Sequence, residues 1–244
     1  YTPTHTLSLH DALPISMIVV HGTDGIAVQT EKMWEDAAKL ELPVMFTVSH
    51  VDGPNSDLQK ILDAPKERYG RGVMPAALPI GSGESMEGVV CLVTGKALRP
   101  KAGSNEVEAG DPPDDMKDAV AAAREELIEM VAESDEELMN AFLEEGELTP
   151  EQFQKGLRVA VNSRSVMPVF AAAGPKMIGA HHVLEAVANF APAPEDRPAA
   201  QITPIDGGDP VELPTDASGP FAAQVFKTYI DKFAGQISVF RVFS

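Results

Sequence analysis

Apolar strand-like runs alternate with helical patterns in the first part of the chain, and this order constrains the fold more than any other feature. The runs at 17–20 and 44–48 have the character of fully buried strands. A pattern with apolar residues at helical spacing follows each run, beginning near Val28 and Leu58. Because neighbouring parallel strands need a crossover connection, strand–helix–strand–helix predicts βαβ units and a parallel sheet.

This α/β pattern is interrupted and then resumes. Residues 73–100 are strand-like and punctuated by glycine, whereas residues 101–113 are polar and rich in Pro and Gly, which predicts a loop. Residues 114–161 have helical patterns, and a strand pattern returns at 166–173. We therefore predict an α/β sheet that is divided by an insertion at about 77–162.

The chain changes to β structure after a helix predicted at 180–190. A proline-rich linker leads to two strand-like runs, 221–230 and 236–244, which the hairpin-like stretch "DKFAG" connects. An isolated two-stranded hairpin is only marginally stable. We therefore expect these runs to begin a larger β domain, and we expect the chain to be a fragment.

Composition narrows the possible partners and compartments. The formal net charge of -18 argues against nucleic acid as a direct partner. The single cysteine, Cys91, excludes an intrachain disulfide and a cysteine-rich zinc site, lies in an apolar run, and is predicted to be a small core residue. A reducing cytoplasm is the simplest setting. No apolar run approaches the roughly 20 residues of a membrane span.

The first sixteen residues differ in character from the rest of the chain. They read "YTPTHTLSLHDALPIS", without the basic region or the small-residue cleavage site of a signal peptide. The segment resembles a translated sequencing adapter, so residues 1–16 are left out of the fold prediction as a suspected artefact. A native tail is the alternative interpretation.

Acidic residues are concentrated in the predicted insertion. Between Glu106 and Glu151 there are seventeen Asp or Glu residues and two Lys or Arg residues. Such a run usually forms a solvated helix face, and the alternative is a docking surface for a basic partner.

Three local patterns have structural rather than catalytic interpretations. Thr149 and Gln152 have the spacing of a capping box at the start of a helix. His181 and His182 point about 100° apart on a helix and cannot both bind one metal, so both are predicted to be surface or partly packed side chains. Trp34 lies on an apolar helix stripe and is predicted to be a core or interface residue.

The order of these pieces resembles translation elongation factor G and its close paralogues over almost all of residues 17–244. The resemblance implies the following segments: part of a P-loop GTPase (G domain) parallel sheet at 17–76 and 163–192, an inserted acidic α+β subdomain at 77–162, and a linker with the start of a β-barrel domain at 193–244. The matching segments are "MIVVHGTDGIAVQTEKMWEDAAKLELPVMFTVSHVD", "ERYGRGVMPAALPIG", "EELIEMVAESDEELMNAFLEEGELTPEQFQKGLRVAV", "VMPVFAAAGPKMIGAHHVLEAVANFAPAP" and "PFAAQVFKTYIDKFAGQISVFRVFS".

The resemblance also implies a function for the intact protein. Members of this family bind and hydrolyse GTP with Mg²⁺ and promote translocation on the ribosome during protein synthesis. A cytoplasmic monomer that contacts the ribosomal stalk through the acidic helices at 114–161 is expected. The alternative is a non-catalytic paralogue that acts as a ribosome or protein interaction module. A nucleotide-binding α/β domain unrelated to translation is a more remote alternative.

One loop is similar to the guanine-specificity loop of the family, normally Asn-Lys-x-Asp. Here the loop is Ser49-His50-Val51-Asp52. Asp52 keeps the carboxylate that would accept two hydrogen bonds from guanine, a pair that adenine cannot donate. Ser49 replaces the asparagine with a shorter hydroxyl, and His50 replaces the lysine with a ring that could still stack on a base.

A second loop is similar to the family's other base-contacting loop, normally Ser-Ala. It has Ala173 and Gly174 at these positions, and Pro175 after them cannot donate an amide. With both loops altered, we expect guanine affinity to be weak or lost.

The motifs that bind phosphate and Mg²⁺ in the family do not stand at their expected places in this chain. The stretch "LVTGKAL" has no earlier glycine at the needed spacing and no hydroxyl after the lysine. We therefore predict no catalytic residue and no metal site here, and no GTP hydrolysis by the chain alone. The sheet is also expected to have an unpaired edge, which disfavours stable folding of the chain by itself.

Overall fold

The computed structural model describes residues 15–243 apart from a few positions, namely 55, 57, 105, 194, 195, 197, 198, 203–208 and 217. Most of the segment suspected to be an artefact lies outside the described residues, although Ser16 is the first residue of a strand. The chain divides into a compact unit at 15–191 and a second unit that contains 192–244.

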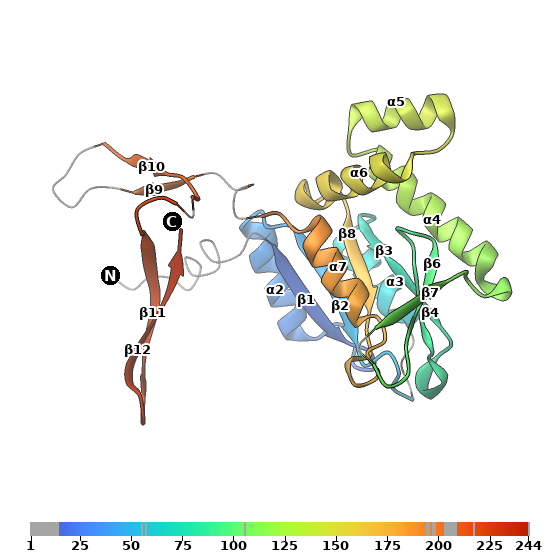
Figure 1. The fold of residues 1–244 in the computed structure, drawn as a ribbon, viewed down its shortest axis with the longest axis horizontal. Coiled ribbons are helices and arrows are strands. Elements are labelled where there is room, and N and C mark those ends of the chain that lie inside the picture. The colour runs from blue at the N-terminus through green and yellow to red at the C-terminus, as the bar shows by residue number, and fades with distance from the viewer. Residues whose placement is uncertain are drawn as a thin grey trace. The chain divides into compact units, whose positions relative to one another are not determined.

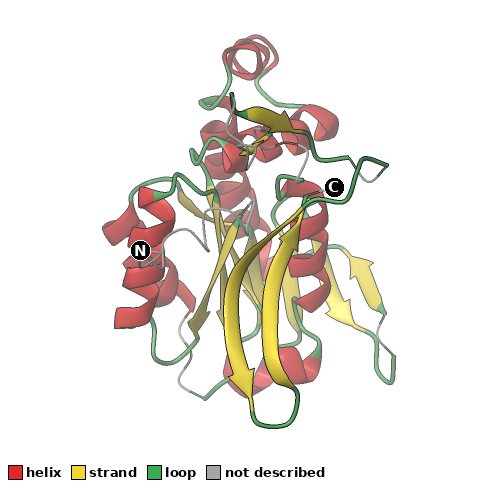
Figure 2. Cartoon of the chain, turned by 90° about the vertical axis from the view of Figure 1, so that its left-hand side faces the viewer, coloured by secondary structure: helices red, strands yellow, loops and turns green. Residues whose placement is uncertain are grey.

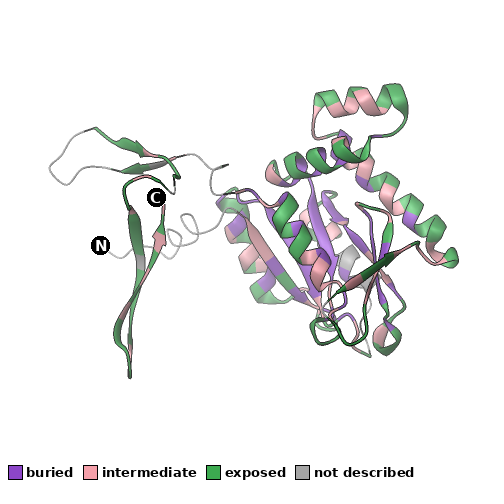
Figure 3. Ribbon diagram, viewed as in Figure 1, coloured by how far each residue is buried: buried purple, intermediate pink, exposed green. Residues whose placement is uncertain are grey.

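A four-stranded parallel sheet forms the centre of the larger unit (Figure 1). Its order is β1 (Ser16–His21), β2 (Val44–Ser49), β8 (Met167–Ala171) and β3 (Val73–Pro75). Every residue of β8 and all but the last residue of β2 are buried, as the purple strands of Figure 3 show. The prediction of an α/β unit with a parallel sheet is confirmed, and continuous burial explains the apolar strand sequences.

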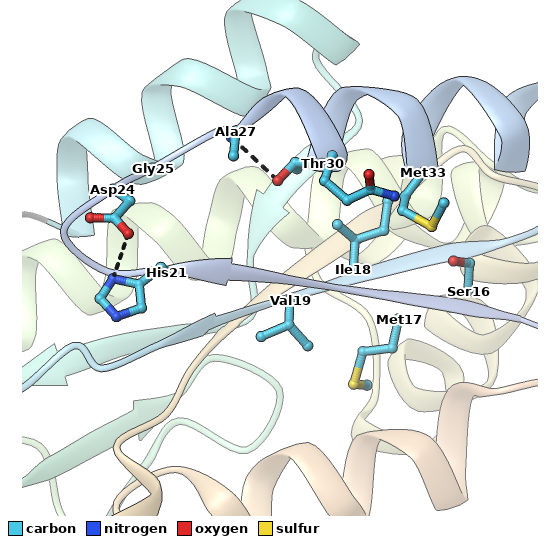
Figure 4. Close-up of a pocket in the computed structure, with 11 residues that line it drawn as sticks. Ser16, Met17, Ile18, Val19, His21, Asp24, Gly25, Ala27, Thr30 and Met33 are labelled. Carbon is cyan, nitrogen blue, oxygen red and sulfur yellow. Dashed lines mark hydrogen bonds and ion pairs between the residues drawn. The ribbon is translucent and has the colours of Figure 1, made fainter.

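Helices cover both faces of this sheet. The crossover helices α2 (Val28–Lys39) and α3 (Leu58–Tyr69) pack on one face, where Trp34 and Tyr69 have ring centroids 4.4 Å apart. Right-handed crossovers in one direction along the sheet place both helices on the same side. The helix α7 (Ala180–Phe190) lies on the opposite side of β1 from α2 (Figure 4).

A second sheet stands between β3 and β8 in the sequence. It is antiparallel, in the order β4 (Ala77–Ile80), β5 (Gly88–Cys91), β6 (Lys96–Pro100) and β7 (Val107–Gly110), with a short helix η1 (Gly83–Ser85) after β4. The strand β7 corrects the loop predicted at 101–113, because residues 107–110 pair with 97–100. Cys91 is buried, as predicted.

Three helices follow this sheet, preceded by a short helix η2 (Asp114–Met116). They are α4 (Lys117–Ala132), α5 (Glu136–Glu145) and α6 (Pro150–Asn162), and they confirm the helices predicted in this region. The predicted capping box is present at the start of α6. The Gln152 amide donates to Thr149 Oγ1 at 3.2 Å, and the Thr149 amide donates to Gln152 Oε1 at 2.8 Å.

His182 corrects the prediction made for the two histidines of α7. Its side chain is buried, in edge-to-face contact with Phe170 of β8 at a centroid distance of 5.0 Å. His182 shares the buried stripe of α7 with Ala186 and Phe190, at intervals of four residues. His181 is partly exposed, in agreement with the prediction for that residue. Trp34 is partly buried among aromatic rings, which agrees with a core or interface role.

The second unit consists of antiparallel strand pairs. The predicted hairpin is confirmed as β11 (Ala223–Asp231) and β12 (Gly235–Val242), the long yellow pair in Figure 2. Asp231 organises the turn, because the Ala234 and Phe233 amides donate to its carboxylate and hold its pKa below the usual value. A second pair, β9 (Ala200–Ile202) and β10 (Val211–Leu213), lies in the region of the linker and was not predicted.

Candidate functional site

Three parallel strands of the main sheet end beside one another and bring their loops to one edge. β1 ends at His21, β2 at Ser49 and β8 at Ala171. The Ala172 amide donates to Val48 O at 2.8 Å, so the loops after β2 and β8 leave the sheet as neighbours. We call this region the carboxyl edge, and we define it as residues 21–24, 49–53 and 172–178. Ligands of open α/β sheets bind at such an edge.

Asp52 lies in the loop after β2 with its side chain largely enclosed, at 17% relative exposure. Lys176 Nζ, from the loop after β8, is 3.5 Å from Asp52 Oδ2. The same ammonium group donates to Glu84 O of η1 at 3.1 Å. One lysine thus connects the two predicted base-contacting loops with a turn of the antiparallel sheet. The sequence prediction missed Lys176, although a basic residue close behind Ala173 was the available signal.

Ser49 and His50 are engaged with the end of β1. Ser49 Oγ donates to Val20 O at 3.3 Å, and His50 Nδ1 lies 3.2 Å from Ser49 Oγ. Because the serine proton points to a carbonyl, His50 Nδ1 is the donor to Ser49 Oγ. His50 has a left-handed backbone conformation, with φ of 55°. Its ring stacks on His21 with 4.5 Å between centroids and 24° between planes.

His21 was not singled out by the sequence, yet it supports the loop that contains Asp52. Its Nδ1 accepts from the Thr23 amide at 3.3 Å and lies 3.7 Å from Asp24 Oδ2. The close approach of β1 to this loop depends on Gly22. A Cβ atom at Gly22 would lie 2.7 Å from the carbonyl oxygens of both Ser49 and His50. Glycine is the residue that permits such a contact.

Ala173 and Gly174 form a compact turn with their own partners. Ala173 is buried, and its amide donates to Ile178 O at 2.9 Å. The backbone donor expected from this loop is therefore already used at Ala173. Since Pro175 has no N–H, the Gly174 amide is left as the donor for a ligand in this part of the loop. Gly174 itself is exposed.

The carboxyl edge thus unites all five predicted site residues, which are Ser49, His50, Asp52, Ala173 and Gly174. Its chemistry is that of a small polar recognition site with the carboxylates of Asp24 and Asp52, the ammonium group of Lys176 and two stacked imidazoles. Among the described residues, no group of three or more His, Cys, Asp or Glu side chains could hold a metal ion. No helix in the described part of the chain is both long enough and apolar enough to span a membrane.

Comparison with known proteins identifies a similar fold and does not assign an activity. No protein-family model matches the chain. The crystal structure of a protein from Thermus thermophilus is similar, with a TM-score of 0.80 and 28% sequence identity. The match covers 98% of this chain and 33% of that protein. The chain therefore spans about a third of the length of that protein, and almost all of the chain shares its fold with the matched part.

Proposed function

We propose that the chain is part of a translational GTPase similar to elongation factor G. In this proposal, residues 17–76 and 163–192 form the base-contacting part of the G domain, and 77–162 form its insertion. The supporting observation is the carboxyl edge, where the loops after adjacent parallel strands β2 and β8 meet and Lys176 joins them through Asp52. These are the loops in which the family reads guanine.

The geometry supports weak guanine recognition at this edge. Asp52 would accept hydrogen bonds from the guanine ring N–H and exocyclic amine, and a base without these donors would offer this partly buried carboxylate no hydrogen bond. Three features oppose tight binding. Lys176 already pairs with Asp52, the ring of His50 is stacked on His21, and the Ala173 amide is used within its loop.

GTP and Mg²⁺ are the cofactors expected for the intact protein. In this proposal, the loops of the carboxyl edge would contact the guanine base and not the phosphates or Mg²⁺. The sequence has no glycine-rich phosphate loop at the required spacing, and the described residues include no cluster suited to Mg²⁺.

The acidic helices fit a ribosomal docking role in the same proposal. Exposed carboxylates lie along α4 and α5. Among the described residues of these two helices, Glu126 forms an ion pair with Lys66 and Glu133 forms one with Arg71. Such a face complements a basic partner, and we propose the ribosomal stalk protein in the cytoplasm. Ser49 and His50 already make hydrogen bonds and a ring contact within the protein. These contacts favour one alternative, a paralogue that docks without binding nucleotide.

A titration with fluorescently labelled GDP tests the weakened base site. We expect no saturable binding in the micromolar range, because Lys176 already pairs with Asp52, His50 is stacked on His21 and the Ala173 amide is used within its loop. Labelled ADP should behave in the same way. Tight binding that prefers GDP, is lost in Asp52→Ala and persists in Asp24→Ala would contradict the expectation of a weakened site.

A further inference from the structure

A turn of the antiparallel sheet contacts both of the loops that follow β2 and β8 at the carboxyl edge. The turn joins β4 to β5 and contains η1, and we call residues 81–87 the β4–β5 turn. Lys176 Nζ, from the loop after β8, donates to Glu84 O of this turn at 3.1 Å. A Cβ atom at Gly83 would lie 3.3 Å from Gly53 O, in the loop after β2. The insertion thus reaches the candidate base site at two points.

The β4–β5 turn is held in shape by its own backbone. The Met86 amide donates to Gly83 O at 3.1 Å, and the side chain of Met86 is buried. Gly81 has φ of 81°, in the left-handed region, and a Cβ atom there would overlap Ser85 O. These contacts fix the direction of the Glu84 carbonyl. The acceptor that holds the lysine is therefore placed by the fold of the antiparallel sheet.

Asp52 and Lys176 differ in how firmly each is held. The loop around Asp52 is closed by the Gly53 amide, which donates to His50 O at 3.0 Å, and its carboxylate is largely enclosed. Lys176 has a flexible four-carbon stem, and its side chain is 40% exposed. The ammonium group is therefore the part of the pair that can move, and Glu84 O is the contact that restrains it beside Asp52.

We propose that the β4–β5 turn regulates base recognition through Lys176, an inference that rests on the proposed function. With the turn in place, Glu84 O holds the ammonium group against Asp52, where it blocks the carboxylate that guanine would use. A shift of the turn withdraws this acceptor and leaves only a partly exposed ion pair, which stabilises little. The guanine ring N–H and exocyclic amine can then displace the ammonium group from Asp52.

The two states of this device differ in the position of one side chain. In the closed state Lys176 contacts both Asp52 and Glu84 O, and in the open state its ammonium group is in solvent. The apparent guanine affinity is reduced by the fraction of molecules in which the site is open. Anything that shifts the β4–β5 turn would thus change this affinity, and guanine binding would loosen the turn in return.

NMR titration of isotopically labelled variants with guanosine and, separately, adenosine tests the coupling. These neutral probes keep phosphate charge out of the comparison when a lysine is removed. Lys176→Met should raise guanosine affinity by about fivefold, which is the upper range for an ion pair of this exposure. Gly81→Ala should also raise it, because the added Cβ atom displaces the turn and with it Glu84 O. In the double variant, affinity should equal that of Lys176→Met alone, since both changes act on the same contact.

Two control variants separate this coupling from general effects of the substitutions. Gly103→Ala places the same change between β6 and β7 of the same sheet, at φ of 76°, where a Cβ atom would meet nothing within 4 Å. Lys155→Met removes one positive charge on α6. Both should bind guanosine as the wild type does, whereas Asp52→Ala should remove the response in every background.

The possible outcomes distinguish the regulation from the base site itself. Equal guanosine preference in the wild type and Lys176→Met would overturn the regulation and leave the proposed base site intact. An effect of Gly81→Ala that adds to that of Lys176→Met, or that Gly103→Ala reproduces, would also overturn the regulation. If no variant distinguishes guanosine from adenosine, the proposed base site fails, and its regulation fails with it.

Discussion

Lowering the pH from 7 to 4 is expected to reduce the free energy of unfolding by about 3 kcal/mol through His182 alone. The side chain is 3% exposed, and neither ring nitrogen has a hydrogen-bond partner among the described residues. Burial lowers the pKa of His182 to about 4, against a smaller opposing effect of Glu185. The unfolded chain takes up this proton near pH 6.5 and the folded chain does not, so stability falls as the pH drops between these two values.

Urea unfolding at a series of pH values checks this expectation. His182→Leu should be at least as stable as the wild type at pH 7, because it removes two buried nitrogens without partners. It should also lose this share of the acid dependence. His181→Leu, at the partly exposed neighbouring position, is the control and should retain it. If the free energies of unfolding of the wild type and His182→Leu changed equally with pH, this role of His182 would be refuted.

Gly179→Ala is expected to destabilise the larger unit by about 2–4 kcal/mol. Gly179 has φ of 69°, in the left-handed region that favours glycine. A Cβ atom there would overlap the carbonyl oxygen of Ala171, at the end of β8. The substitution would therefore disturb the turn that positions Ala173 and Lys176 at the carboxyl edge.

Gly174→Ala provides the matched control for this prediction. Gly174 lies in the same loop, but a Cβ atom there would meet no other atom within 4 Å, and its φ is outside the left-handed region. We expect a change within about 0.5 kcal/mol, as for other surface substitutions. Denaturant unfolding of both variants measures the difference. Equal stability of the two alanine variants would show that the tight turn at Gly179 does not contribute as described.

The parts of the fold that were predictable are those in which burial dictates the sequence. The strands at 44–48 and 167–171 are buried on both faces, so nearly all of their residues are apolar. The strand β7 was missed because none of its residues is buried, and it has no apolar alternation to identify it. The strand forms because residues 97–100 of β6 pair with it, and the sequence of residues 107–110 does not reveal this pairing.

The position of the candidate site at one edge of the sheet was predictable from the sequence, but the contacts between its loops were not. Parallel strand ends placed Asp52 and Ala173 at the same edge, since the carboxyl ends of parallel strands lie together. The pairs Lys176–Asp52 and His21–His50 depend on which strands are neighbours, and no local pattern encodes that order. The burial of His182 was detectable, because Ala186 and Phe190 continue its stripe on α7.

The most direct test of base recognition at the carboxyl edge is an NMR titration of the isotopically labelled chain with millimolar GMP and, separately, AMP. The account predicts that GMP shifts the amide signals of residues 49–53 and 173–177, that AMP does not, and that Asp52→Ala removes the response. Equal responses to both nucleotides, or GMP shifts that lie away from these two loops, would contradict it.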